Sequence, residues 1–137
     1  MAVQPAKTLG VPIKVMILLV EDDGPSSRAV TLALKPAGHE VMNASDGVEA
    51  LELLSKHQFE LVITDLLMPK LNGQNLFNTI RLKWPHMPII LMSGYLSKDL
   101  GNAITDGMSA FLQKPFTPTA LIMTVERLLP KSSWLSL

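Results

Sequence analysis

The sequence predicts an α/β fold in which a doubly wound, five-stranded parallel sheet carries helices on both faces. Short apolar runs alternate along the chain with segments whose apolar residues recur every three or four positions. The changes between the two patterns fall at turn residues such as Gly, Pro, Asn and Ser. Strands that alternate with helices need right-handed crossovers, and these produce a parallel sheet that is covered on both sides.

Composition limits the classes of protein to which this chain can belong. Its 137 residues, of which 47% are hydrophobic, suit one domain with a single core. Twelve basic and twelve acidic residues balance, so no basic footprint for nucleic acid is present. The absence of cysteine excludes disulfides, thiol catalysis and zinc–thiolate sites. The aliphatic run at residues 15–20 is too short to span a membrane, and no signal peptide is evident, so a cytoplasmic protein is expected.

The first strand is expected at residues 14–20, a buried apolar run that ends at three consecutive acids. A helix should follow, because Pro25 suits the first helical turn and the apolar residues after it share one face. Pro36 should kink or end this helix before Gly38.

The second and third strands are predicted from two further short runs. Residues 40–44 form the second strand, and the turn at residues 45–47 caps the next helix. Residues 61–65 form the third strand, which is rich in β-branched side chains and ends at Asp65. The third helix is expected at residues 72–83.

The remaining elements continue the alternation. A fourth strand at residues 88–92 precedes a less periodic helix around residues 98–106. A fifth strand at residues 110–113 leads into the last helix at residues 117–129, which Pro130 ends.

Polar residues stand at the carboxyl ends of four of the five predicted strands. They are Glu21 and Asp22, Asp65, Ser93 and Lys114. All four ends lie at one edge of a parallel sheet, so these side chains are expected to converge. Three crowded carboxylates repel one another unless cations neutralise them; Lys114 supplies one charge and a divalent cation such as Mg²⁺ would supply the rest. The pattern predicts an anion site bridged to a metal, with one carboxylate free to act as a nucleophile.

Each signal taken alone also has a plain structural explanation. Successive acids after a strand are commonly a solvated loop or a helix N-terminus, and a single Asp is commonly a cap or turn residue. Their joint placement at the strand ends favours the functional interpretation. The histidines His39, His57 and His86 lack the spacing of metal ligands and are expected on the surface.

Four blocks in this order resemble the receiver domain of two-component response regulators: residues 17–23, residues 64–69 with Gly73, Ser93-Gly94, and residues 111–116. The resemblance covers residues 14 to 129. It implies a flavodoxin-like fold with strand order 2-1-3-4-5. The expected organisation is a flexible N-terminal extension at residues 1–13, a receiver domain at 14–130 and a tail at 131–137.

The resemblance also implies roles for individual residues. Asp65 would accept a phosphoryl group from a histidine kinase or a histidine phosphotransfer protein. Asp22 and Asp65 would bind Mg²⁺ or Mn²⁺, with Glu21 contributing through a water molecule and Leu67 through its backbone carbonyl. Lys114 would form an ion pair with the phosphoryl group.

A conformational switch is implied as well. Ser93 would bond the phosphoryl group, and Phe111, three residues before the lysine, would swing inward and act through packing alone because it lacks a hydroxyl. The change would reach the face formed by helix 4, strand 5 and helix 5, which is also expected as a homodimer surface. Tyr95 is expected to restrict water access, and Gly94 to loosen its loop. The peptide bond before Pro115 is expected to be cis.

Three other function classes fit the sequence less well. A phospho-aspartyl hydrolase needs a second acid two residues after its nucleophile, where Leu67 stands. A nucleotide- or flavin-binding module needs a Gly-rich phosphate loop after the first strand, where the acids at 21–23 would repel phosphate unless metal is present. A degenerate, purely structural receiver would not need the acids together with Ser93 and Lys114.

The expected role is therefore signalling, not metabolic catalysis. The protein would take phosphoryl groups, also from small phosphodonors, and hydrolyse its own phospho-Asp65. The sequence ends seven residues after Pro130, so no output domain is expected within it. The alternatives are a receiver module excised from a hybrid histidine kinase, or a phosphorelay intermediate or phosphate sink. Direct contact with nucleic acid or membrane is not expected.

Overall fold

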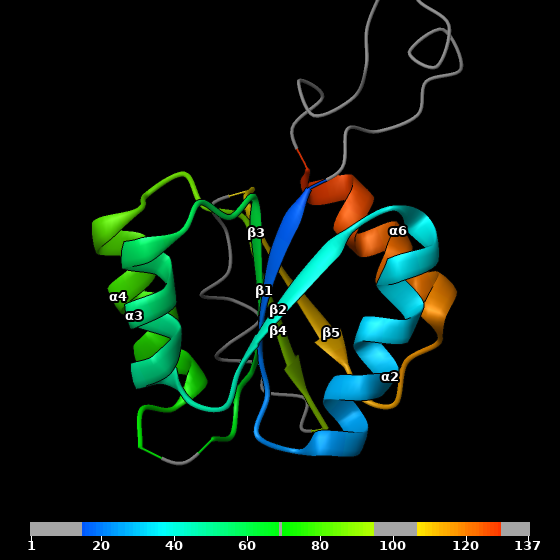
Figure 1. Cartoon of the computed structure of the whole chain (residues 1–137), viewed down its shortest axis with the longest axis horizontal. Helices are drawn as coiled ribbons and strands as arrows, with labels where there is room; N and C mark the ends of the chain where they lie inside the picture. The colour runs from blue at the N-terminus through cyan, green and yellow to red at the C-terminus, as the bar shows by residue number, and fades with distance from the viewer. Residues whose placement is uncertain (1–14, 69, 95–106, 130–137) are drawn as a thin grey trace, which may run out of the picture.

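The structure, a computed structural model, describes residues 15–68, 70–94 and 107–129. Within these ranges five strands alternate with helices (Figure 1). The strands are β1 (Met16–Val20), β2 (Glu40–Ala44), β3 (Leu61–Asp65), β4 (Ile89–Ser93) and β5 (Ser109–Gln113). The helices are α2 (Gly24–Leu34), the short 3₁₀ helix η1 (Lys35–Ala37), α3 (Gly47–Lys56), α4 (Gly73–Lys83) and α6 (Pro118–Leu128).

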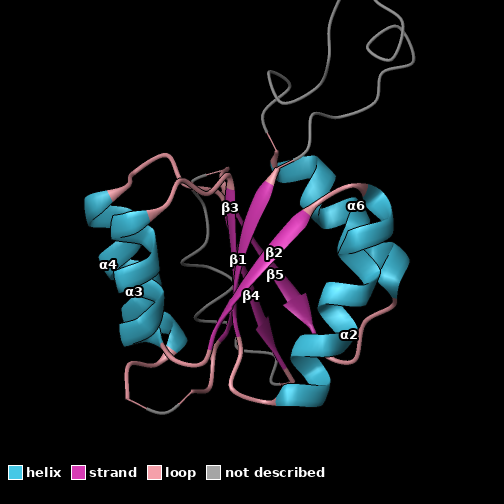
Figure 2. Cartoon of the chain, viewed as in Figure 1, coloured by secondary structure: helices cyan, strands magenta, loops and turns pink. Residues whose placement is uncertain are grey.

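All five strands are parallel and are ordered β2-β1-β3-β4-β5. Helices α2 and α6 cover one face of the sheet, and α3 and α4 cover the other (Figure 2). This confirms the predicted flavodoxin-like fold. Element boundaries differ from the predicted ones by one or two residues; β1, for example, begins at Met16. The predicted helix at residues 98–106 lies outside the described residues, as do the two terminal segments.

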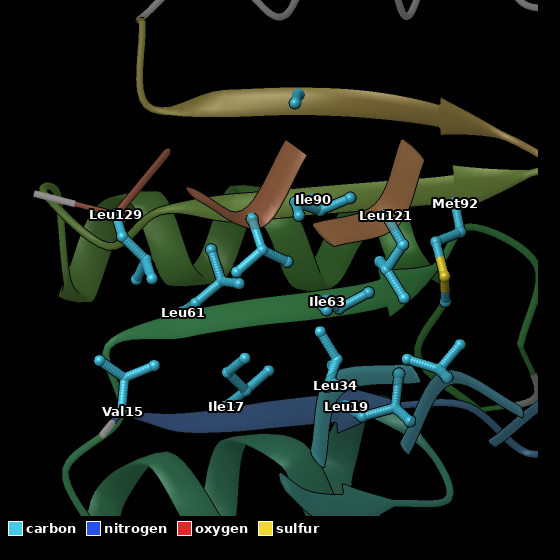
Figure 3. Packing of buried hydrophobic residues seen from close by; sticks show 13 residues of the cluster. Val15, Ile17, Leu19, Leu34, Leu61, Ile63, Ile90, Met92, Leu121 and Leu129 are labelled. Carbon is cyan, nitrogen blue, oxygen red and sulfur yellow. The ribbon is translucent and has the colours of Figure 1, made fainter. Parts of the chain in front are cut away.

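The core consists of two apolar layers, one on each side of the sheet. Successive strand residues point to opposite faces, so Ile17 and Leu19 pack toward α2 and α6, whereas Leu18 and Val20 pack toward α3 and α4. Figure 3 shows the first layer, in which Leu34 and Leu121 cover the strands. Burial on both faces explains why the strands read as continuous apolar runs.

Each described α-helix begins at a side chain that caps it. The side-chain oxygens of Asp23, Asp46, Asn72 and Thr117 each accept a hydrogen bond from a backbone N–H of the first turn. These four caps fix where the described helices leave the carboxyl edge of the sheet.

The connection between α2 and β2 confirms one prediction and corrects another. The α-helix ends at Leu34, and Pro36 lies in η1, before Gly38 turns the chain with φ 92°. His39, expected on the surface, is only 4% exposed, because this turn brings its backbone N–H back to Leu34 O at 3.4 Å. His57 and His86 are exposed as predicted. No helix in the described ranges has the length and apolar character needed to cross a membrane.

Candidate functional site

Three carboxylates meet where β1 and β3 end. These strands are neighbours in the sheet, with Val20 beside Thr64, so the residues that follow them emerge side by side. One oxygen each from Glu21, Asp22 and Asp65 lies within 4.8 Å of the others. Glu21 is 2% exposed, whereas Asp22 is open to solvent. The predicted convergence of these acids is therefore present in the fold.

The lysine after β5 bridges two of these acids. Lys114 Nζ lies 3.0 Å from Asp65 Oδ2 and 3.1 Å from Glu21 Oε1. Its backbone N–H donates to Ser93 O at 2.8 Å, which fixes the start of the β5–α6 loop against the end of β4. The peptide bond to Pro115 is cis, as predicted. One ammonium group thus joins residues from three strands.

Burial and hydrogen bonding have opposing effects on the pKa values of Glu21 and Lys114. Burial raises the pKa of Glu21 and repulsion from Asp65 adds to this, although the hydrogen bond from Lys114 opposes both. Burial disfavours the charge on Lys114, but hydrogen bonds to Asp65 and Glu21 outweigh it and raise the lysine pKa above its usual value. The lysine is therefore a fixed cation between two of the acids, and a metal ion would add further positive charge to the cluster.

The loop after Asp65 returns toward its carboxylate. Leu67 N–H donates to Asp65 Oδ1 at 3.3 Å, so the Leu67 backbone lies beside this oxygen, while its side chain is exposed. A Cβ placed on Gly73 would lie 2.3 Å from Asp65 O, which makes this close approach possible only for glycine. Asp65 is therefore contacted by two residues of the loop that follows it.

Three of the predicted switch residues lie within or directly after β4 and β5. Ser93 ends β4 and is buried, and Gly94 after it is exposed. Phe111 pairs with Leu91 across β4 and β5 and packs against the apolar layer on the α3 and α4 side. Tyr95 lies outside the described residues.

One acid of the first block has a different task. Asp23 Oδ2 accepts a hydrogen bond from Ser26 N at 2.9 Å and caps α2, which is the plain structural explanation of that residue. The structure also contains an ion pair between Lys70 and Asp46, which the sequence does not predict. The motif Asp46-Gly-Val-Glu49 signals a helix cap, but no pattern in the sequence points to Lys70 as its partner.

A model of the response regulator receiver domain family matches residues 17–126. This chain belongs to that family. The receiver domain is 38% identical over 112 residues to the response regulator protein FleR of Pseudomonas aeruginosa. The matched region covers 81% of this chain and 24% of FleR. It is 34% identical to the sensor kinase CckA of Brucella abortus, over 84% of this chain and 12% of CckA.

Solved structures lead to the same family. The chemotaxis protein CheY4 of Vibrio cholerae superposes with a TM-score of 0.77 at 31% identity, over 85% of the receiver domain and 99% of CheY4. The strand order and the acidic cluster at the carboxyl edge thus belong to a receiver domain of two-component signalling. The receiver domain spans only a small part of the length of FleR and of CckA.

Proposed function

We propose that this receiver domain is a phosphoacceptor switch in which Asp65 takes a phosphoryl group from a phosphohistidine of a histidine kinase or phosphotransfer protein. An oxygen of the Asp65 carboxylate forms the new P–O bond as the P–N bond of the donor breaks. The observation that carries the proposal is the pairing of Lys114 Nζ with Asp65 Oδ2 at 3.0 Å, inside a cluster of three acids. A solitary capping aspartate would need neither a partly buried lysine nor two further acids.

The donor set fits a hard divalent cation. Three carboxylates within 4.8 Å offer oxygen ligands only, which Mg²⁺ and Mn²⁺ prefer. Asp22 and Asp65 would hold the ion directly, Glu21 through water, and Leu67 through its backbone carbonyl. When bound, the ion offsets the negative charge on the phosphoryl oxygens.

The residues around Asp65 have complementary tasks. Lys114 pairs with the Asp65 carboxylate before transfer and with a phosphoryl oxygen afterwards. Ser93 offers its hydroxyl to the same group from the end of β4. Both residues are fixed by the Lys114 N–H to Ser93 O hydrogen bond, so a movement of one affects the other.

The output of the switch is proposed to run through Phe111. Its ring packs against the α3 and α4 layer, and its inward movement after Ser93 shifts would alter the surface of β5 and α6 together with the helix expected at residues 98–106. That surface is also the proposed homodimer interface. Moving such an equilibrium from mostly off to mostly on requires about 5 kcal/mol of differential stabilisation.

Incubation with acetyl phosphate and Mg²⁺ tests the proposal. Intact mass spectrometry should show the gain of one phosphoryl group, which is lost slowly by self-hydrolysis. The gain should be absent in Asp65→Asn and after chelation of the metal. If the parent protein gains no phosphoryl group from acetyl phosphate in the presence of Mg²⁺, the proposal is overturned.

A role as a phosphorelay intermediate or phosphate sink is the second candidate. The match to part of a sensor kinase favours it, because such a module can sit within a larger kinase. If phosphorylated receiver domain returns its phosphoryl group to an isolated histidine phosphotransfer protein, the relay function is supported. Hydrolysis without any transfer favours the terminal switch.

A further inference from the structure

The loop that joins β3 to α4 is held by a hydrogen bond at each of its two ends. At the first end, Leu66 N–H donates to Met92 O at 2.8 Å. At the second, Gly73 N–H donates to Leu66 O at 2.9 Å, and the glycine lies directly against Asp65. Leu67, the residue proposed to offer its carbonyl to the metal, lies between these attachments. The ends alone do not fix the middle of the loop.

A third attachment holds the middle of the loop to α3. Lys70 Nζ lies 3.2 Å from Asp46 Oδ2, while Asp46 Oδ1 accepts a hydrogen bond from Glu49 N at 2.8 Å and caps the helix. The Asp46 side chain is 13% exposed, and the hydrogen bond from Glu49 N together with Lys70 lowers its pKa. A single carboxylate therefore serves the helix with one oxygen and the loop with the other.

The backbone at this attachment is unusual. Lys70 adopts φ 65°, a left-handed backbone conformation that residues other than Gly and Asn rarely take. The next residue, Leu71, lies against Gly47: a Cβ added to Gly47 would come within 2.8 Å of Leu71 Cβ and Leu71 O. This conformation costs free energy, so contacts with the start of α3 must hold it.

We propose that Asp46 and Lys70 form a positioning pair that sets the Leu67 backbone for metal binding beside Asp65. This inference rests on the proposed function. Leu67 already donates its N–H to Asp65 Oδ1, so displacement of the loop changes the geometry of the carboxylate that would hold the ion. Neither member of the pair belongs to the acidic cluster, and both act through the backbone.

The two charges could instead act only through their electric field, and the two explanations predict different signs. A field effect makes Lys70→Met bind Mg²⁺ more tightly, because a positive charge is removed, and makes Asp46→Asn bind it more weakly. A positioning role makes both variants bind it more weakly. Asn keeps an oxygen that caps α3, so Asp46→Asn removes the ion pair without removing the helix cap.

The test is an Mg²⁺ titration of the whole chain followed by the backbone amide shifts of Asp22 and Asp65. Each single variant should raise the Kd about two- to fivefold, the range expected from an exposed ion pair. The double variant should bind no more weakly than either single one, because both remove the same contact. Lys56→Met, at the opposite end of α3, is the matched control and should leave the Kd unchanged.

Hydrogen exchange gives a readout that needs no metal. The Leu67 and Leu71 amides of both single variants should exchange faster than those of the parent, whereas the amides of β3 should not. Opposite shifts of the Kd in Lys70→Met and Asp46→Asn, or no shift in either, overturn the positioning role even if Asp65 is phosphorylated. If the parent binds no Mg²⁺ at all, the metal-dependent proposed function fails together with this inference.

Discussion

Lys114 Nζ lies 3.0 Å from Asp65 Oδ2, and these two residues are 49 positions apart in the sequence. Their contact links the ends of β3 and β5, which have β4 between them in the sheet. The same ammonium group reaches Glu21 Oε1, so removing it leaves two carboxylates facing each other at the edge of the core. Both the charge and the geometry of the proposed phosphorylation site therefore depend on this lysine.

Replacing Lys114 with Met should slow phosphorylation without abolishing metal binding. The variant loses the cation that stabilises charge on the transferring group, a loss of about 10²-fold in rate by analogy with single electrostatic contacts in other active sites. Its Mg²⁺ affinity should not fall, because the three acids remain. The time course of phosphorylation by acetyl phosphate, measured by intact mass, checks this. A rate equal to that of the parent would show that Lys114 has no part in transfer.

Replacing Glu21 with Gln should stabilise the metal-free protein and weaken metal binding. Burial raises the Glu21 pKa, so the folded state binds more protons than the unfolded state and loses stability as the pH rises above 4.5, the usual pKa of the group. A neutral isostere escapes this loss, which is on the order of 1 kcal/mol for each tenfold change in the acid dissociation constant. Urea unfolding at pH 7 with and without Mg²⁺ measures both effects. A Gln variant that is less stable without metal contradicts the account.

His39 should make the protein less stable in mild acid. Burial lowers its pKa, although the nearby Glu126 carboxylate opposes this, and neither ring nitrogen has a hydrogen-bond partner within the described residues. Because the folded-state pKa is depressed, stability is fully present above pH 6.5 and falls as the pH drops from there toward that lower pKa. Every tenfold difference in the acid dissociation constant between the folded and unfolded states corresponds to about 1.4 kcal/mol.

Substitution of His39 by Phe isolates this effect. Unfolding free energies of the parent and of His39→Phe, measured from pH 7.5 to 5, should diverge in slope, with the variant showing the weaker dependence on pH. Parallel curves would mean that His39 does not titrate differently in the folded and unfolded states.

Gly73 and Gly94 should respond differently to the same change. A Cβ on Gly73 would meet Asp65 O and Leu66 Cα at 2.3 and 2.7 Å, whereas a Cβ on Gly94 meets no atom of the described residues within 4 Å. Gly73→Ala should therefore cost about 1–3 kcal/mol and disturb the Asp65 loop, and Gly94→Ala should cost less than about 0.5 kcal/mol. Denaturant unfolding compares the two. Equal costs would contradict the packing seen around Gly73.

The fold and the outline of the site could be predicted from the sequence because both follow from local patterns. The apolar run that ends at Asp65 and the run that ends at Glu21 mark the carboxyl ends of two strands. A parallel sheet places these two ends side by side. The sequence does not show that Asp23 differs in role from Glu21 and Asp22, because its capping role depends on the position of its carboxylate relative to Ser26 N.

Other features depend on the path of the chain in space. The burial of His39 results from the left-handed turn at Gly38, and the pairing of Lys70 with Asp46 results from a left-handed lysine that no periodicity signals. Polar residues such as His39 and Lys70 follow no repeating pattern in the sequence, so their roles depend on the three-dimensional path of the loops.

The proposed function requires that Asp65 itself carries the phosphoryl group. The most direct measurement treats the protein with acetyl phosphate and Mg²⁺, reduces the acyl phosphate with borohydride, and locates the reduced residue by tandem mass spectrometry of the peptide that contains residues 61–68. Homoserine should appear at position 65 in the treated parent and should be absent from the sample without Mg²⁺. Reduction at Asp22 or Glu21 instead, with Asp65 intact, would contradict the proposed function.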